Sequence, residues 1–129
     1  MGKECWINLP VKDLGKSKGF FKELGFRLNE RFSDSDAMAG VVIGSHNAMV
    51  MLFPEDTFMS FTNNAIADTE TCTEILISIS MENEDEVQKL THKAAAAGAV
   101  IFAEPGERNG MYGAGFCDLD GHRWNLLVM

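Results

Sequence analysis

The stretch that decides the fold is Gly110–Met129, which reads GMYGAGFCDLDGHRWNLLVM. Two alternating runs, Met111–Cys117 and His122–Val128, flank the tetrapeptide Asp118–Gly121. An Asp-Gly pair between such runs is a strong signal for a β-hairpin. Successive side chains of a strand point to opposite faces, so the second run has one apolar face and one mixed face. We expect the apolar face to meet helices and the mixed face to line a pocket.

The bulk composition is that of one ordinary globular domain. The chain has 129 residues, of which 46% are hydrophobic and 23% are charged. Nineteen Asp and Glu outnumber eleven Lys and Arg, giving a net charge of −8. Nucleic acids and anionic membranes both attract clustered positive charge, and no apolar run approaches the roughly 20 residues of a membrane-spanning helix. We therefore expect no nucleic-acid partner and no membrane partner.

The cysteines and the N-terminal sequence indicate a cytoplasmic protein. Cys5, Cys72 and Cys117 are widely spaced and form no Cys-x-x-Cys motif, which argues against a disulfide framework or a zinc site. No secretory signal precedes Trp6. We expect reduced, partly buried thiols in a reducing compartment.

The rest of the chain follows one pattern twice. We expect strands at Cys5–Val11, Phe26–Phe32, Met38–Ile43 and Ala48–Phe53, and then at Thr73–Ser80, Ala99–Ala103 and the two hairpin runs. Helices are expected at Lys12–Leu24 and from Asn83 to Ala97, each closed by a glycine, Gly25 or Gly98. Pro54–Cys72 reads as a linker with one short helix at Thr57–Thr62, and Glu104–Asn109 reads as a loop.

This order is β-α-β-β-β, linker, β-α-β-β-β. It predicts an α+β fold, in which two βαβββ modules pair into a curved, cup-shaped mixed sheet with helices outside. The single domain covers residues 1–129, with module one at about 1–54, a linker at 55–72 and module two at about 73–129.

The alternation within the strands assigns residues to the two sides of this cup. The side that faces the helices is almost purely aliphatic and collects Ile7, Leu9, Val50, Leu52, Ile75, Ile77, Ile79, Trp124, Leu126 and Val128. The cup side collects Trp6, Asn8, Met49, Met51, Phe53, Glu74, Ser78, Arg123 and Asn125. A mixture of aromatic, methionine, amide and charged residues is typical of ligand pockets.

Several motifs resemble the vicinal-oxygen-chelate superfamily of glyoxalase I, bleomycin-resistance proteins and extradiol dioxygenases. The residues that carry the resemblance are INLPVKDL at Ile7–Leu14, Phe20-Phe21, LGF at Leu24–Phe26 and FCDLDGHRW at Phe116–Trp124. The match spans essentially the whole chain. It is closest to the branch labelled glyoxalase-like or predicted lactoylglutathione lyase. The resemblance implies a homodimer, in which the two modules of one cup come from one chain or from two.

The resemblance also implies four metal-ligand positions in the cup, which here hold Trp6, Met51, Glu74 and Asn125. Only Glu74 is a good ligand for a divalent cation. Asn125 offers a weak carbonyl oxygen, the soft sulfur of Met51 suits copper(I), and Trp6 cannot ligate. Because a catalytic metal site needs about three protein ligands, we read this site as degenerate and expect no cofactor. A divalent metal remains the alternative.

The candidate site combines one acid with an apolar pocket. Glu74 is the candidate catalytic residue, as a general base, a remnant ligand or an anchor for a cation, although it could equally be a solvated carboxylate or pair with Arg123. The expected pocket residues are Trp6, Asn8, Met51, Phe58, Phe61, Met111, Tyr112, Arg123 and Asn125. Each of these could instead serve ordinary packing. We expect no ligand or base role for His46, His92 or His122.

Three functions fit these observations. The first is a metal-free small-molecule binding protein of the glyoxalase/bleomycin-resistance type. The alternative is a lactoylglutathione-lyase-like or other metal-dependent lyase or isomerase that acts on a small oxygenated substrate, with Glu74 as base. The third is an interaction module whose cup is filled by Trp6 and its own methionines. The ligand itself is not encoded in any recognisable motif.

Overall fold

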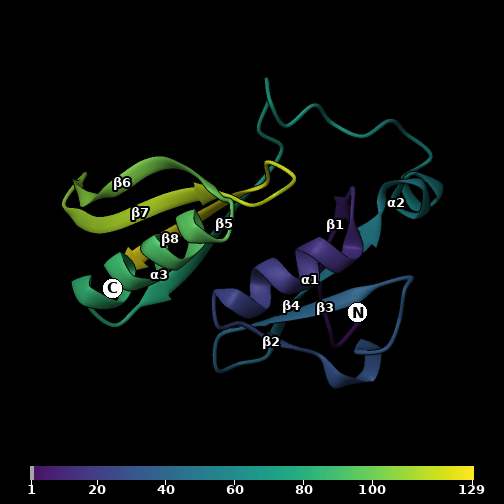
Figure 1. Ribbon diagram of the computed structural model, residues 1–129, viewed down its shortest axis with the longest axis horizontal. Helices are drawn as coiled ribbons and strands as arrows, with labels where there is room; N and C mark the ends of the chain where they lie inside the picture. The colour runs from purple at the N-terminus through teal and green to yellow at the C-terminus, as the bar shows by residue number, and fades with distance from the viewer. Residues whose placement is uncertain (1) are drawn as a thin grey trace. The chain divides into compact units, whose positions relative to one another are not determined.

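The computed structural model describes residues 2–129 and divides the chain into two compact units, Met1–Ile66 and Ala67–Met129 (Figure 1). Each unit holds a four-stranded mixed sheet, with the orders β1-β4-β3-β2 and β5-β8-β7-β6. The two orders are the same pattern, so the predicted repeat and the α+β fold of two βαβββ modules are confirmed. The boundary falls inside the linker expected at 55–72. The pairing of the two sheets into one cup stays a prediction.

The first unit contains β1 (Ile7–Val11), α1 (Leu14–Glu23), β2 (Arg27–Leu28), the 3-10 turn η1 (Glu30–Phe32), β3 (Ala39–Ile43), β4 (Ala48–Pro54) and α2 (Glu55–Thr62). β1 is an edge strand parallel to β4. Pro10, which has no backbone N–H to donate, is tolerated in such a strand. The expected strand at 26–32 was too long. It ends at Leu28 because the Asn29 side chain accepts the backbone N–H of Arg31 at 2.9 Å and starts η1.

The second unit contains β5 (Leu76–Met81), α3 (Glu84–Ala96), β6 (Val100–Arg108), β7 (Met111–Cys117) and β8 (Arg123–Val128). The hairpin of β7 and β8 is confirmed, with Phe116 paired to Trp124. The loop expected at 104–109 was wrong. β6 continues to Arg108, because register shifts on both sides of Ala103 let it stay paired with β7 past Pro105.

The helix ends follow the sequence signals. The side chain of Asp13 accepts the N–H of Lys16 at 3.0 Å, and that of Asn83 accepts the N–H of Glu86 at 2.9 Å. Beyond the helices, Gly25 and Gly98 have φ of +93° and +107°, a backbone conformation that costs glycine little.

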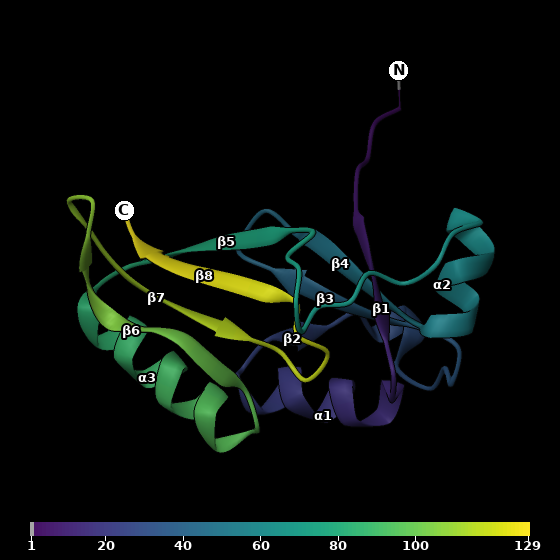
Figure 2. The same ribbon diagram turned by 90° about the horizontal axis from the view of Figure 1, so that it is seen from above.

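Each helix α1 and α3 lies along one face of the sheet in its own unit (Figure 2). The buried hydrophobic residues of the first unit include Leu9, Val11, Leu14, Phe20, Phe21, Leu24, Val41, Val50 and Leu52, and those of the second include Met81, Val87, Ala94, Ala114, Phe116, Trp124 and Leu126. Half of the predicted aliphatic face is buried, namely Leu9, Val50, Leu52, Trp124 and Leu126, whereas Ile75, Ile77, Ile79 and Val128 are half-buried and Ile7 is exposed. Within residues 2–129, no helix is long and apolar enough to cross a membrane.

Candidate functional site

The first unit contains an apolar cavity of about 330 Å³. Its lining residues come from the N-terminal segment, η1, β4 and the loops before η1 and β3: Glu4, Trp6, Asn29, Arg31, Phe32, Met38, Met49, Met51 and Phe53. The structure therefore brings together Trp6 and Met51, two of the residues that the sequence assigned to a pocket. It also adds Asn29, Phe32 and Met38, which were not expected in the pocket from the sequence.

Gly40 on β3 leaves space for the side chains of two of the methionines that line the cavity. Gly40 pairs in register with Met51. A Cβ added at Gly40 would lie 2.7 Å from Sδ of Met49 and 3.1 Å from Sδ of Met51. The amide of Asn29 donates a hydrogen bond of 3.5 Å to Sδ of Met49, which holds one thioether in place. Flexible, polarisable methionines of this kind adapt to irregular ligands.

Trp6 lines this cavity but is not buried in it. Its side chain is 53% exposed, whereas Met51 is 5% exposed. The Phe61 ring of α2 packs edge-on against Phe53, with ring centroids 5.0 Å apart. Phe58 is half-buried on the same helix, and Asn8 is exposed beside Met51 in the register of β1 and β4. The expected pocket residues of module one thus gather around one sheet, with Trp6 and Met51 in the cavity wall.

A larger hollow of about 490 Å³ shares Asn29 and Met49 with this cavity. Its other lining residues include the charged or polar Arg27, Glu30 and Asn47. Ligand sites are mostly apolar with a few placed polar groups. The smaller cavity is therefore the better candidate.

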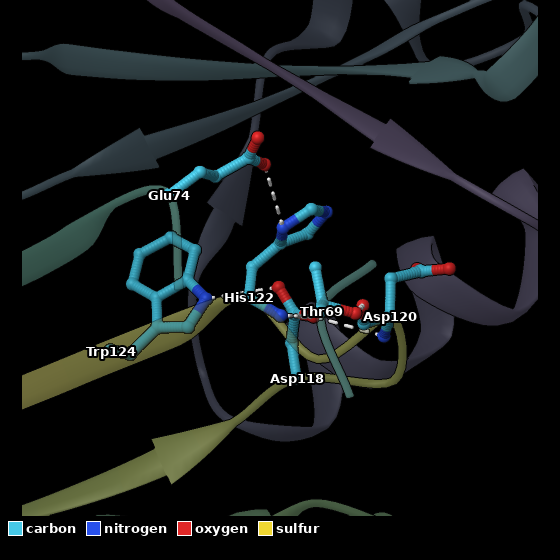
Figure 3. A network of polar contacts seen from close by, with 6 residues as sticks. All are labelled: Thr69, Glu74, Asp118, Asp120, His122 and Trp124. Atoms are coloured by element: carbon cyan, nitrogen blue, oxygen red, sulfur yellow. Dashed lines mark hydrogen bonds and ion pairs between the residues drawn. The ribbon is translucent and has the colours of Figure 1, made fainter. Parts of the chain in front are cut away.

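The second unit contains a polar network around Asp118 (Figure 3). The buried carboxylate accepts the backbone N–H groups of Asp120 at 3.0 Å and His122 at 3.1 Å, and the indole N–H of Trp124 at 3.0 Å. Burial raises the pKa of the Asp118 carboxyl above its ordinary value, although His122 and the three N–H donors act in the opposite direction. The network fixes the turn between β7 and β8.

The segment before β5 is attached to that turn. The hydroxyl of Thr69 donates to the carbonyl oxygen of Asp120 at 2.6 Å. Gly121 has φ of +82°, and a Cβ there would lie 2.4 Å from the Thr69 hydroxyl oxygen. A glycine is thus required both by the backbone conformation and by the close approach of Thr69.

Glu74 pairs with a histidine, His122, for which no ligand or base role was expected from the sequence. Oε1 of Glu74 lies 3.7 Å from Nδ1 of His122, with side-chain exposures of 38% and 1% (Figure 3). The side chain of His122 is buried. Its position shares the alternation of the core residues Trp124 and Leu126, and that signal was available in the sequence. His46 and His92 are exposed, as expected.

The open face of the second sheet carries the other candidates, where "open face" denotes the side formed by Leu76, Ser78, Arg123, Asn125 and the glycines of β7. The amide of Asn125 donates to the hydroxyl of Ser78 at 3.3 Å. The guanidinium carbon of Arg123 lies 4.5 Å from the centroid of the Phe102 ring. Phe102 was not singled out from the sequence.

The two remaining pocket candidates lie elsewhere. The hydroxyl of Tyr112 accepts a hydrogen bond of 2.9 Å from the amide of Gln88 on α3, so Tyr112 points to the helix side of the sheet. Met111 is exposed at the start of β7, opposite Arg108. The structure does not bring either residue to Arg123 and Asn125.

The residues at the four implied metal positions do not fit a divalent cation. Trp6 has no ligating atom, and Met51 packs its thioether over Gly40. Glu74 faces His122, and the amide of Asn125 is bonded to Ser78. Across the described part of the chain, no group of three or more His, Cys, Asp or Glu side chains is placed to hold a metal ion.

Comparison with known proteins points to one superfamily. A family model described as bleomycin resistance protein-like N-terminal matches residues 4–44. A hypothetical protein from S. aureus is similar over 100% of this chain and 95% of its own, with 36% identity and a TM-score of 0.90. The chain belongs to the vicinal-oxygen-chelate superfamily. No curated protein sequence matches the chain.

More distant members of this superfamily share the fold alone. A glyoxalase-related enzyme from Fulvimarina pelagi has 17% identity and a TM-score of 0.82, covering 100% of this chain and 89% of its own. A genomically encoded fosfomycin resistance protein from Listeria monocytogenes has 20% identity and a TM-score of 0.72, covering 100% and 94%. The region that matches the bleomycin-resistance model includes Trp6, Asn29 and Met38 of the cavity.

Proposed function

We propose that the chain is a small-molecule binding protein of the glyoxalase/bleomycin-resistance type, and that its ligand enters the cavity of the first unit. The observation that carries the proposal is this cavity, whose volume of about 330 Å³ lies within the usual range of ligand pockets, about 300 to 1,000 Å³. Its apolar lining favours an aromatic or amphipathic ligand.

The polar groups of the cavity give such a ligand its orientation. Glu4, Asn29 and Arg31 supply two charges and an amide to an otherwise apolar lining. A few placed polar groups in an apolar site fix the position of a ligand. Trp6, at 53% exposure, offers a free aromatic face at the mouth.

The proposed binding is independent of metal and cofactor. The donor set described above supports this, because one exposed carboxylate already paired with His122 is too few ligands for a metal centre. The proposal includes a cytoplasmic homodimer without nucleic-acid or membrane partners. The net charge of −8 supports the absence of nucleic-acid and membrane partners, and the free cysteines support the cytoplasmic assignment.

The fluorescence of the two tryptophans tests the proposal. Trp6 is 53% exposed and Trp124 is 0% exposed, so acrylamide should quench Trp6 and spare Trp124. A library of aromatic and amphipathic compounds is screened for protection of Trp6 from quenching. The Trp6→Phe variant is the matched control, because it keeps an aromatic wall but removes the reporter. The proposal fails if no compound protects Trp6 from quenching. It also fails if every compound that reduces quenching in the native chain does so equally in Trp6→Phe, where Trp124 is the remaining tryptophan.

The Glu74–His122 pair favours a second candidate, a lyase or isomerase of the glyoxalase type. A carboxylate that is 38% exposed and 3.7 Å from an imidazole nitrogen can reach a substrate and exchange a proton with it. The test is lactoylglutathione formation, with and without added nickel, zinc or manganese. Turnover that is lost in Glu74→Gln would support an enzyme. Absence of turnover under every condition, or full turnover in the variant, would reject this candidate.

A further inference from the structure

Two turns of the second unit contain a sequence that can react with itself. Asn109-Gly110 lies between β6 and β7, and Asp120-Gly121 lies between β7 and β8. In such a pair the backbone nitrogen of the glycine can attack Cγ of the preceding side chain and close a succinimide ring, because glycine has no Cβ to shield that nitrogen. Asn109 is the only asparagine of the sequence that precedes a glycine. The structure distinguishes the two turns.

The turn at Asp120-Gly121 is closed to this attack. The N–H of Gly121 donates to the carbonyl oxygen of Asp118 at 3.0 Å. Thr69 covers the glycine, since an added Cβ there would lie 2.4 Å from the Thr69 hydroxyl oxygen. The same hydroxyl donates to the carbonyl oxygen of Asp120 at 2.6 Å. The attacking nitrogen is therefore already bonded, and the main chain beside it is fixed.

The turn at Asn109-Gly110 has neither protection. Both residues are exposed, and a Cβ added at Gly110 would meet nothing within 4 Å. Among the turn and loop hydrogen bonds of residues 2–129, none engages the N–H of Gly110. The side-chain oxygen of Asn47 is held by the guanidinium of Arg27 at 2.7 Å, whereas within the same described residues the Asn109 side chain has no such partner. Both reacting groups are thus accessible.

The backbone of this turn permits the reaction but slows it. The φ angle is +53° at Asn109 and +79° at Gly110, the signature of a type I′ turn, and Arg108 pairs with Met111 directly beside it. Asparagine is tolerated in the left-handed region, although it is not favoured there. Ring closure takes Asn109 out of this conformation, and an exposed hairpin end opens at little cost in free energy.

We propose that Asn109 is a site of spontaneous deamidation, which converts it into aspartate and isoaspartate. The nitrogen of Gly110 bonds to Cγ of Asn109, and the side-chain NH₂ group leaves as ammonia with the proton of that nitrogen. Water then opens the succinimide. Cleavage between the nitrogen and Cγ gives aspartate, and cleavage between the nitrogen and the main-chain carbonyl carbon of Asn109 gives isoaspartate. The site shares no residue with the cavity of the first unit, so this proposal and the proposed function can fail separately.

The two products differ in their effect on the hairpin. Asp-Gly suits a type I′ turn as Asn-Gly does, so aspartate keeps Arg108 paired with Met111. Isoaspartate adds a carbon atom to the main chain of the turn, which disrupts that pairing. Tyr112 follows on β7, and its hydroxyl accepts a hydrogen bond of 2.9 Å from the amide of Gln88 on α3. The isoaspartate form should therefore loosen the contact between the hairpin end and α3.

The test is ageing of the purified chain at neutral pH and physiological temperature in water labelled with ¹⁸O, followed by peptide mapping with mass spectrometry. We expect the peptide that contains Asn109 to lose its amide and gain labelled oxygen, with isoaspartate as the larger product. The rate should rise with pH, because the attacking nitrogen reacts after losing its proton. An unchanged Asn109 would overturn the proposal. Equal conversion of Asn63 or Asn64, which are exposed but precede no glycine, would also overturn it.

Two variants of the turn test the mechanism and its consequence. Gly110→Ala places a methyl group beside the attacking nitrogen and should slow conversion at least severalfold; conversion at the full native rate would overturn the proposal. Tyr112 is the one tyrosine of the sequence, so its NMR signals report on the hairpin end without ambiguity. The aged native chain should acquire a second set of Tyr112 signals, whereas Asn109→Asp should keep the native set. A native set alone in a chain shown to contain isoaspartate would overturn the structural consequence.

The second turn supplies the matched control for protection by the fold. Thr69→Ala uncovers Gly121 and should increase isoaspartate at Asp120, while conversion of Asn109 keeps its rate. Urea should have the same effect on Asp120 in the native chain. Isoaspartate that forms at Asp120 equally fast in the native chain, in Thr69→Ala and in urea would contradict the selection of Asn109 by the structure.

Discussion

Replacement of Asp118 by Asn places two donors face to face in the core of the second unit. In the native chain one carboxylate oxygen accepts two backbone N–H groups and the other accepts the indole N–H of Trp124 at 3.0 Å. An asparagine carbonyl can keep the two backbone donors, but its NH₂ group then faces the indole N–H. Trp124 is 0% exposed, so water cannot take over the lost contact.

The cost follows from that arrangement. A buried donor left unsatisfied costs about 1–3 kcal/mol. Part of this is offset because the variant no longer buries a charge, and the raised pKa of Asp118 shows that its burial is unfavourable. We expect a net loss of about 2 kcal/mol in the free energy of unfolding.

A second substitution tests the mechanism. Trp124→Phe alone removes the indole donor, keeps a ring over Phe116, whose ring is stacked on that of Trp124 at 6.2 Å, and leaves a carboxylate oxygen without its partner. The double variant Asp118→Asn with Trp124→Phe has no opposed donors. Its loss in free energy of unfolding should be smaller than the sum of the losses in the two single variants by about 1–2 kcal/mol, as for groups in one hydrogen-bond network.

Urea unfolding at neutral pH, followed by far-ultraviolet circular dichroism, measures these differences without relying on Trp124 as reporter. Hydrogen exchange of the β8 amides locates the loss in the second unit. The reasoning would be refuted if the free energy of unfolding of either single variant lay within about 0.5 kcal/mol of the native value. It would also be refuted if the loss in the double variant equalled the sum of the two single losses.

Three further predictions concern other parts of the chain. The pKa of Asp118 is raised in the folded chain, so its contribution to stability is fully present below the unfolded pKa and is lost as pH rises through the folded pKa. The free energy of unfolding of the native chain, relative to that of the Asp118→Asn variant, should therefore be larger at about pH 4 than at neutral pH when urea unfolding is repeated there. Cys5 and Cys72 are exposed, whereas Cys117 is buried with a raised pKa, so iodoacetamide should label the first two and reach Cys117 only in urea; rapid labelling of all three in the native chain would contradict this. Gly40→Ala places a methyl group 2.7 Å from Sδ of Met49, so it should cost about 1 kcal/mol by crowding and weaken any cavity ligand, as measured by urea unfolding and by protection of Trp6 from acrylamide.

Much of the fold follows from short-range signals. The Asp-Gly turn, the glycines after both helices and the period-two runs each correspond to a specific backbone requirement, and each is confirmed. Errors arise where a local interaction overrides the pattern. Asn29 caps η1 and shortens β2, and the register shifts of β6 carry a strand through Pro105.

The candidate site was harder to predict because it depends on which side chains meet. Alternation assigns His122 to the buried side with Trp124, and it assigns Tyr112 to the helix side with Phe116; both placements could have been predicted. The contact between Phe102 and Arg123 could not, since it depends on the shifted register of β6 and on the bare surface of Gly115.

The central claim is that a small molecule binds the cavity of the first unit, and methionine methyl signals test it most directly. Met38, Met49 and Met51 line the cavity, whereas Met81, Met111 and Met129 belong to the second unit. In a chain labelled with ¹³C at the methionine methyls, a compound that protects Trp6 should shift the first three signals along one saturation curve and leave the other three in place. Shifts confined to the second unit, or no shift with any aromatic or amphipathic compound, would contradict the claim.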